Sequence, residues 1–194
     1  MPLSLLDYLR AQAYNNAFCN HRLISAVAGL SPADFAAKRT SFFPSIKATL
    51  NHNLTVDWYY VDALERSVHG RPVNTSARDY FEPEEPCETA AQLAAEQRAV
   101  DLRLVRLTRE LTERDLEWPV GVQRRVGVLH EPLPRLLGHL FQHQIHHRGQ
   151  AHAMLAGTDV APPQLDEFFC ANEAHLRASE LAELGFTEVE IWGG

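Results

Sequence analysis

Residues 139–152 read His139-Leu-Phe-Gln-His-Gln-Ile-His-His-Arg-Gly-Gln-Ala-His152 and hold five of the chain's ten histidines. Two of these, His143 and His147, are four residues apart. On a helix this spacing places both imidazoles on one face, with roughly 5–6 Å between their Cβ atoms. Two such nitrogens can converge on one metal ion at about 2.0–2.1 Å. The stretch therefore indicates a metal site on a helix.

A helical wheel drawn at about 100° per residue separates the histidines of this stretch. The neighbouring apolar residues form one stripe; His147 falls inside it and His143 lies at its edge. His146 points well away from the stripe, so we interpret it as a surface group or as one that supports a ligand. His139 lies one turn before His143, and its role is open. The wheel predicts that His143 and His147 face inward.

The pattern around the histidines predicts a helix that opens at Pro132 or Pro134 and ends by Gly157. Three other segments have helical spacing of apolar residues, namely Leu3 to Ala28, Ser45 to about Ser67, and Glu88 to Leu111. Ser45 is the expected N-cap of its helix. Four amphipathic helices with little strand signal predict an all-α fold, a four-helix bundle. The core of such a bundle is where facing helices can supply metal ligands.

The segments between these helices differ in character. Residues 68–87 contain glycine and several prolines, and we expect them to form a long crossover connection. Residues 114–130 are expected to form an irregular segment or a short hairpin before the last helix of the bundle. The tail from Leu165 to Leu184 is expected to add a short helix or a strap. We expect residues 1–194 to form a single domain.

Composition limits the classes of function. The chain has 25 acidic and 18 basic residues and a net charge of -7, which argues against a nucleic-acid partner. The first residues lack a basic segment and a cleavage site, and no run is apolar enough to span a bilayer. We therefore expect a cytoplasmic protein without a membrane partner. Cys19, Cys87 and Cys170 are odd in number and far apart, which favours reduced thiols.

Two ligands from one helix are too few for tight metal binding, so a third is expected elsewhere. His52, in the second helix, is the best candidate, although the apolar face of that helix is centred well away from it. Asp57 falls close to the middle of that face. Because a buried carboxylate is costly unless it is paired, Asp57 is expected to contact an imidazole N–H, an arginine or bound substrate.

Three stretches carry a resemblance to a known family. Residues 140–150 contain His-Gln-Ile-His-His-Arg-Gly-Gln, residues 45–57 place His52 five residues before Asp57, and residues 14–23 read Tyr-Asn-Asn-Ala-Phe-Cys-Asn-His-Arg-Leu. These resemble the motifs of the DinB/YfiT-like family of metalloenzymes, whose strongest mark is H-x-x-x-H-R-G-Q. Phe18 stands where that family commonly has tryptophan. The resemblance covers nearly the whole chain.

The resemblance implies a four-helix bundle that holds a divalent metal through His52, His143 and His147. Zinc is the metal expected first, with nickel, iron or manganese as alternatives. Relatives include S-transferases and isomerases that use low-molecular-weight thiols such as bacillithiol or mycothiol, and dimers are common among them. The implied partners are therefore a small-molecule substrate, including such a thiol, and a second copy of the chain in a homodimer.

Three neutral imidazoles leave a metal with open positions, which is typical of catalytic zinc. A water or thiol bound there would lose its proton near neutral pH. Our leading hypothesis is a metal-dependent S-transferase or hydrolase in which a thiol or water attacks a small electrophile. In this hypothesis, Asp57 orients a ligand or acts as a base, and Arg148 or Arg39 lies near the substrate. Arg148 could equally form a structural ion pair. The alternative is a non-catalytic metal- or ligand-binding stress-response protein.

Overall fold

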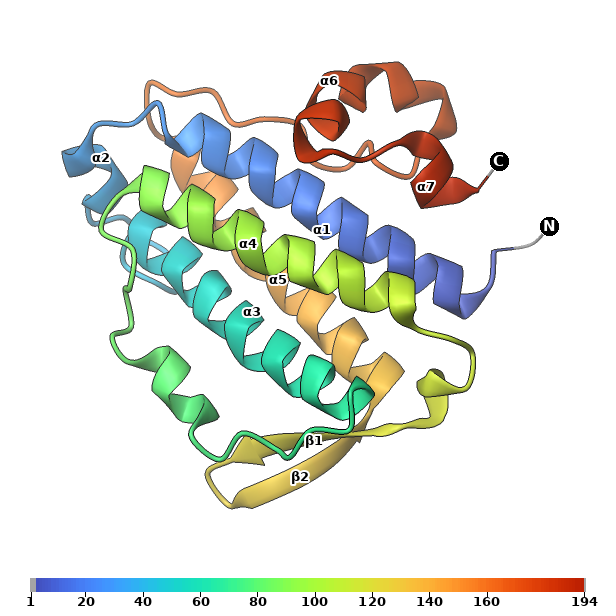
Figure 1. Ribbon diagram of the computed structural model, residues 1–194. Helices are drawn as coiled ribbons and strands as arrows, with labels where there is room; N and C mark the ends of the chain where they lie inside the picture. Colours follow the sequence, from blue (N-terminus) through green and yellow to red (C-terminus); the bar gives the residue numbers. More distant parts are fainter. Residues whose placement is uncertain (1–2, 194) are drawn as a thin grey trace.

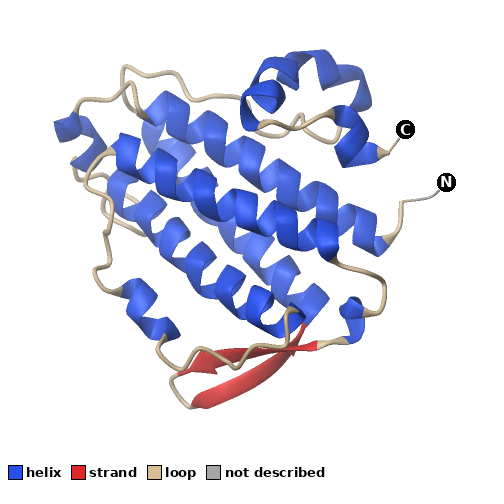
Figure 2. Cartoon of the chain, viewed as in Figure 1, coloured by secondary structure: helices blue, strands red, loops and turns tan. Residues whose placement is uncertain are grey.

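A computed structural model describes residues 3–193. Four long helices form a bundle: α1 (Leu5–Val27), α3 (Ile46–Val68), α4 (Ala90–Glu110) and α5 (Leu133–Leu155) (Figures 1 and 2). The predicted all-α four-helix bundle is confirmed. None of the described helices combines the length and the hydropathy needed to cross a membrane.

The order of the helices explains the long crossover. Both α1 and α3 pack against α4 and α5. Figure 1 shows that α3 and α4 run in the same direction, and that α5 runs opposite to both. Two consecutive parallel helices need a connection that returns along the bundle, and residues 69–89 provide it. This segment contains the short 3-10 helix η1 (Ala77–Phe81), which the sequence did not predict.

Local capping fixes the ends of the long helices. The Ser45 side chain accepts a 3.0 Å hydrogen bond from the Ala48 amide, as predicted for the start of α3. Thr89 and Gln92 form a capping box at the start of α4, in which each side chain bonds the other residue's backbone N–H. A proline lies in the first turn of α5, where its missing N–H costs nothing. The predicted helix boundaries lie within about two residues of the observed ones.

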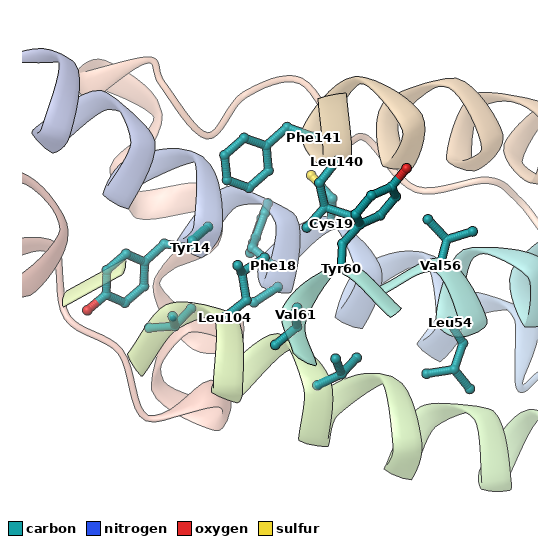
Figure 3. Close-up of a cluster of buried hydrophobic side chains, with 14 of the residues drawn as sticks. Tyr14, Phe18, Cys19, Leu54, Val56, Tyr60, Val61, Leu104, Leu140 and Phe141 are labelled. Atoms are coloured by element: carbon teal, nitrogen blue, oxygen red, sulfur yellow. The ribbon is translucent and has the colours of Figure 1, made fainter. Parts of the chain in front are cut away.

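The core lies between the four helices (Figure 3). Tyr14 and Phe18 of α1, Leu104 of α4, Val61 of α3 and Leu140 of α5 are almost completely buried there. Each buried apolar side chain of this size contributes about 1.5–3 kcal/mol relative to exposure. This packing fixes how each helix is rotated, and therefore which polar side chains are carried into the interior.

A two-stranded antiparallel hairpin precedes α5. Of the two alternatives predicted for residues 114–130, the hairpin is confirmed, although it begins and ends a few residues later than predicted. Its strands are β1 (Pro119–Arg124) and β2 (Gly127–Pro132), and a 3-10 turn, η2 (Asp115–Glu117), comes before them. Val120 and Val122 of β1 are fully buried, and the strand packs against α3. A Cβ at Gly121 would lie 2.5 Å from a methyl carbon of Val73, so the strand passes very close to the crossover segment.

The remaining elements cover the edges of the bundle. A short helix, α2 (Pro32–Ala36), lies in the connection after α1 and was not predicted. The tail forms η3 (Ala171–Glu173), α6 (Ala174–Leu184) and α7 (Glu188–Trp192), and the last two helices pack on α1. The buried Arg177 donates to Glu188 at 2.8 Å and so links α6 to α7. The predicted tail helix is confirmed, while α7 was missed because it follows the predicted end at Leu184.

The hairpin provides a stability test. Gly127 has φ of 115°, a conformation that residues with a Cβ rarely adopt. We expect Gly127→Ala to lower the free energy of unfolding by about 1–3 kcal/mol. The control is Gly138→Ala in α5, where the new Cβ would meet nothing within 4 Å; it is expected to stabilise the helix by about 0.5–1 kcal/mol. Urea unfolding followed by circular dichroism measures both, and equal stability of Gly127→Ala and wild type would contradict the expectation.

Candidate metal centre

The antiparallel packing of α3 and α5 brings three histidines together. His52 of α3 and His143 of α5 place their Nε2 atoms 3.0 Å apart. One ligand atom from each of His52, His143 and His147 can be chosen so that all lie within 4.8 Å of one another. Nitrogens that share one zinc ion with bonds of about 2.0–2.1 Å lie roughly 3–3.5 Å apart. Small side-chain adjustments would therefore let the three imidazoles bind one metal ion.

The pKa values of the three imidazoles are lowered, which favours their neutral form. Burial, followed by the neighbouring His147, lowers the pKa of His52 from 6.5 to about 4. Burial and the surrounding histidines lower the pKa of His143 to about 3. Burial also lowers the pKa of His147, with a partial offset from its hydrogen bond to Gln150. All three rings are therefore neutral near pH 7, which is the form that binds metal.

Gln150 fixes the orientation of His147. The Nδ1 atom of His147 lies 2.8 Å from the Gln150 Oε1 atom. Because an amide oxygen only accepts, Nδ1 carries the proton and the Nε2 lone pair is free for a metal. The amide nitrogen of Gln150 lies 3.1 Å from Nε2 of the exposed His146. His146 is thus a surface group that also contacts Gln150, in line with the wheel. Sequence reasoning missed Gln150, although it belongs to the H-R-G-Q motif.

Two phenylalanines cover one side of the histidines. The Phe43 ring lies 4.4 Å from the His52 ring and 5.4 Å from the His147 ring, centroid to centroid. The Phe42 ring lies 6.1 Å from His147, and its side chain is 77% exposed. Both come from the loop before α3. They limit the access of water from this side. The sequence gave no sign of their contact with the histidines.

The histidines also border a pocket of about 290 Å³. His52 and His143 line it. His139, whose role was open, also lines it and packs edge-on against Tyr60 with ring centroids 5.4 Å apart. The other lining residues come from α3, from η1 and its end, and from the hairpin: Val56, Tyr59, Arg78, Phe81, Gln123, Arg124 and Arg125. A small molecule in this pocket would reach two of the three histidines.

Asp57 lies inside the bundle. Its Oδ2 atom accepts a 2.6 Å hydrogen bond from Gln97 of α4, so its observed partner is an amide, where we had expected an imidazole, an arginine or a substrate. Gln97 also donates to Asp101 at 3.2 Å. Asp57 is not among the residues that line the pocket beside the histidines. The amide partner was missed because Gln97 lies on a helix 40 residues away.

The two arginines expected near the substrate lie elsewhere. Arg148 is buried and donates to the Oδ1 atoms of Asn16 and Asn20 in α1. Both asparagines in turn donate to Asp101, at 3.1 and 3.0 Å. This favours the structural alternative for Arg148. Arg39 donates to backbone carbonyls of the α2 region, at 2.7 and 2.9 Å. Neither arginine lines the pocket beside His52 and His143.

This polar core contains two carboxyl groups and one arginine. Burial, and then the charge of Asp101, raises the pKa of Asp57 from 3.8 to about 8. Burial raises the pKa of Asp101 to about 6, and hydrogen bonds from Asn20 and Gln97 together with the charge of Arg148 limit the rise. The hydrogen bonds and the charge of Arg148 therefore favour the ionised form of Asp101, whereas burial beside Asp101 favours the protonated form of Asp57.

The raised pKa of Asp57 predicts a pH dependence of stability. Between about pH 4 and pH 8 the folded protein holds a proton on Asp57 that the unfolded chain has released. The free energy of unfolding should therefore fall as the pH rises through this range. Asp57→Asn, which keeps the oxygen that accepts from Gln97, removes this contribution and should be more stable than wild type at pH 8.

Urea unfolding at several pH values tests this expectation. Asp159→Asn, at an exposed position, controls for the loss of one negative charge. An unchanged pH dependence in Asp57→Asn would show that Asp57 is ionised in the folded protein.

Comparison with known proteins adds one finding. A model described as the DinB family matches residues 7–180, a span that includes α3, α4, α5, all but the first two residues of α1, and the three histidines. No curated protein matches the chain. The family match spans far more than half of the chain and agrees with the resemblance of its motifs. The chain belongs to the DinB family.

Proposed function

We propose that the protein binds one divalent metal ion through His52, His143 and His147 and is an enzyme in which a thiol or a water attacks a small electrophile. One observation carries this proposal: three neutral imidazoles converge beside a pocket that two of them line. Membership of the DinB family supports it.

The donor set fits a catalytic metal better than a structural one. Structural zinc sites usually have four protein ligands, whereas catalytic sites have three and keep a position open. Imidazole nitrogens suit zinc first, with nickel and iron as alternatives, while manganese prefers oxygen ligands. A bound metal of this kind lowers the pKa of a water or thiol so that hydroxide or thiolate is available near neutral pH.

The chain's own residues would hold and shield the reacting groups. Gln150 keeps the proton of His147 on Nδ1 and leaves Nε2 free. Phe42 and Phe43 pack beside the histidines, and a substrate would reach His52 and His143 from the pocket that these two histidines line. The pocket's small volume favours a small molecule.

We propose that Asp57 is a positioning residue, because it lies behind the histidines and not in the pocket. Its Oδ2 atom accepts from Gln97 of α4 at 2.6 Å. Gln144, which follows His143 in α5, partly offsets the rise in the pKa of Asp57. The Gln144 amide also donates to the Asn53 carbonyl of α3 at 3.2 Å. Gln144 therefore links α5 to α3, and Asp57 links α3 to α4, next to His52 and His143.

Metal content tests the proposed ligands. Wild type is expected to bind about one metal ion per chain. Each of His52→Ala, His143→Ala and His147→Ala should lose at least ten-fold in affinity, because two imidazoles cannot hold the ion tightly. His175→Ala is the control, since this imidazole is exposed on α6 and belongs neither to the three histidines nor to the pocket beside them. Elemental analysis and competition with a chelator measure the affinities. Full metal retention in His147→Ala would exclude the three-histidine site.

Turnover tests the proposed reaction. The metal-loaded protein is incubated with bacillithiol, mycothiol or glutathione and an electrophile such as monochlorobimane, and separately with ester and amide substrates. We expect turnover that needs metal and that His143→Ala abolishes. Product formation is followed by fluorescence or chromatography. Metal binding without turnover on any substrate would favour the alternative, a non-catalytic metal- or ligand-binding protein.

A further inference from the structure

The pocket beside the histidines has one strongly basic wall. Three arginines line it: Arg78 of η1, Arg124 at the end of β1, and Arg125 in the hairpin turn. We call these three residues the arginine wall. None of the residues that line the pocket is acidic, although the chain as a whole has a net charge of -7. The positive charge is therefore concentrated where a small molecule would approach His52 and His143.

The arginine wall is not neutralised by the protein. Within residues 3–193, no carboxylate lies within salt-bridge distance of Arg78, Arg124 or Arg125. By contrast, Arg22, Arg103 and Arg177 each pair with a glutamate. Both Arg78 and Arg125 are exposed to solvent at the mouth of the pocket. Their charges are available to a ligand.

Arg124 is held in place. Its Nη1 atom donates to the Tyr60 hydroxyl at 3.0 Å. Its guanidinium carbon lies 5.3 Å from the centre of the Tyr60 ring and 5.7 Å from that of Tyr59. The hydroxyl of Tyr59 donates in turn to the backbone carbonyl of Gln123. A guanidinium has five N–H donors, and Tyr60 takes one of them in the described chain. A fixed guanidinium with free donors is suited to bind an anion with two oxygens.

We propose that the arginine wall binds an anionic group, a carboxylate or a phosphate, on the small molecule that reaches the histidines. This inference rests on the proposed function, because it names the class of substrate for the same site. The pocket of about 290 Å³ admits a small molecule, and the acidic balance of the chain disfavours a nucleic acid. Arg124 would hold the anionic group, while Arg78 and Arg125 would attract it into the pocket.

Anion binding tests the inference separately from metal binding and turnover. Orthophosphate and succinate are titrated into the full-length protein by calorimetry at constant ionic strength, before and after removal of metal with a chelator. The stronger of the two ligands identifies the preferred kind of anion. We expect binding that persists without metal, because the arginines and not the metal supply it.

Variants of single arginines distinguish a specific contact between Arg124 and the anion from a general effect of positive charge on anion binding. Arg124→Met, which keeps an apolar stem against the tyrosines, should weaken anion binding by about ten-fold or more, and Arg124→Lys by less. Arg78→Gln, at an exposed position, should weaken binding by a few-fold without disturbing packing. The control is Arg106→Gln, exposed on α4 away from the pocket, which should bind as wild type does.

Three results would overturn the inference: no binding of either anion by wild type, unchanged binding in Arg124→Met, or an equal loss in Arg106→Gln. Metal content is measured on the same samples. If wild type has a normal metal content but binds neither anion, the inference about the arginine wall is rejected and the proposed function is not. If wild type binds an anion but holds no metal, the proposed function is rejected and anion binding by the arginine wall is not.

Discussion

The close packing of α3 against α5 is the constraint on which the candidate site depends. It places Nε2 of His52 and Nε2 of His143 3.0 Å apart. A change of one residue in register would move a side chain by about 1.5 Å along the helix and about 100° around it. Such a change would take His52 out of reach of the other two histidines. The apolar core, with Leu54 and Leu140 fully buried, prevents that movement.

A buried polar network fixes the same helices from inside the bundle. It runs from Asp57 of α3 through Gln97 and Asp101 of α4 to the asparagines of α1 that hold Arg148 of α5. All four helices therefore contribute to one set of hydrogen bonds. Burial of two carboxyl groups is costly, and the structure limits the cost through hydrogen bonds to both carboxyl groups and through the raised pKa of Asp57. Because Arg148 directly follows His147, this network also fixes the turn of α5 that carries a candidate ligand.

The candidate site combines two features that favour anions. Three imidazoles bring no negative charge, so a divalent metal held by them keeps its full positive charge. The arginine wall faces the same pocket, and none of the pocket-lining residues is acidic. A thiolate or hydroxide, and a substrate that carries a carboxylate or a phosphate, would be stabilised in such surroundings. The hairpin, whose strand β1 packs on α3, supplies Arg124, the member of the arginine wall that is held by a hydrogen bond to Tyr60.

The sequence by itself determined the four helices, their ends and the inward pair His143 and His147, because apolar spacing, capping and a shared helix are local properties. Periodicity did not select His52, since both the Leu54 side and the Val56 side of α3 are buried; the family motif supplied it. Only the tertiary structure decided which groups meet from distant segments. These are the amide that bonds Asp57, the asparagines that hold Arg148, the phenylalanines over the histidines and the arginine wall. Such contacts depend on how helices pack and where a hairpin lies, and no local pattern encodes them.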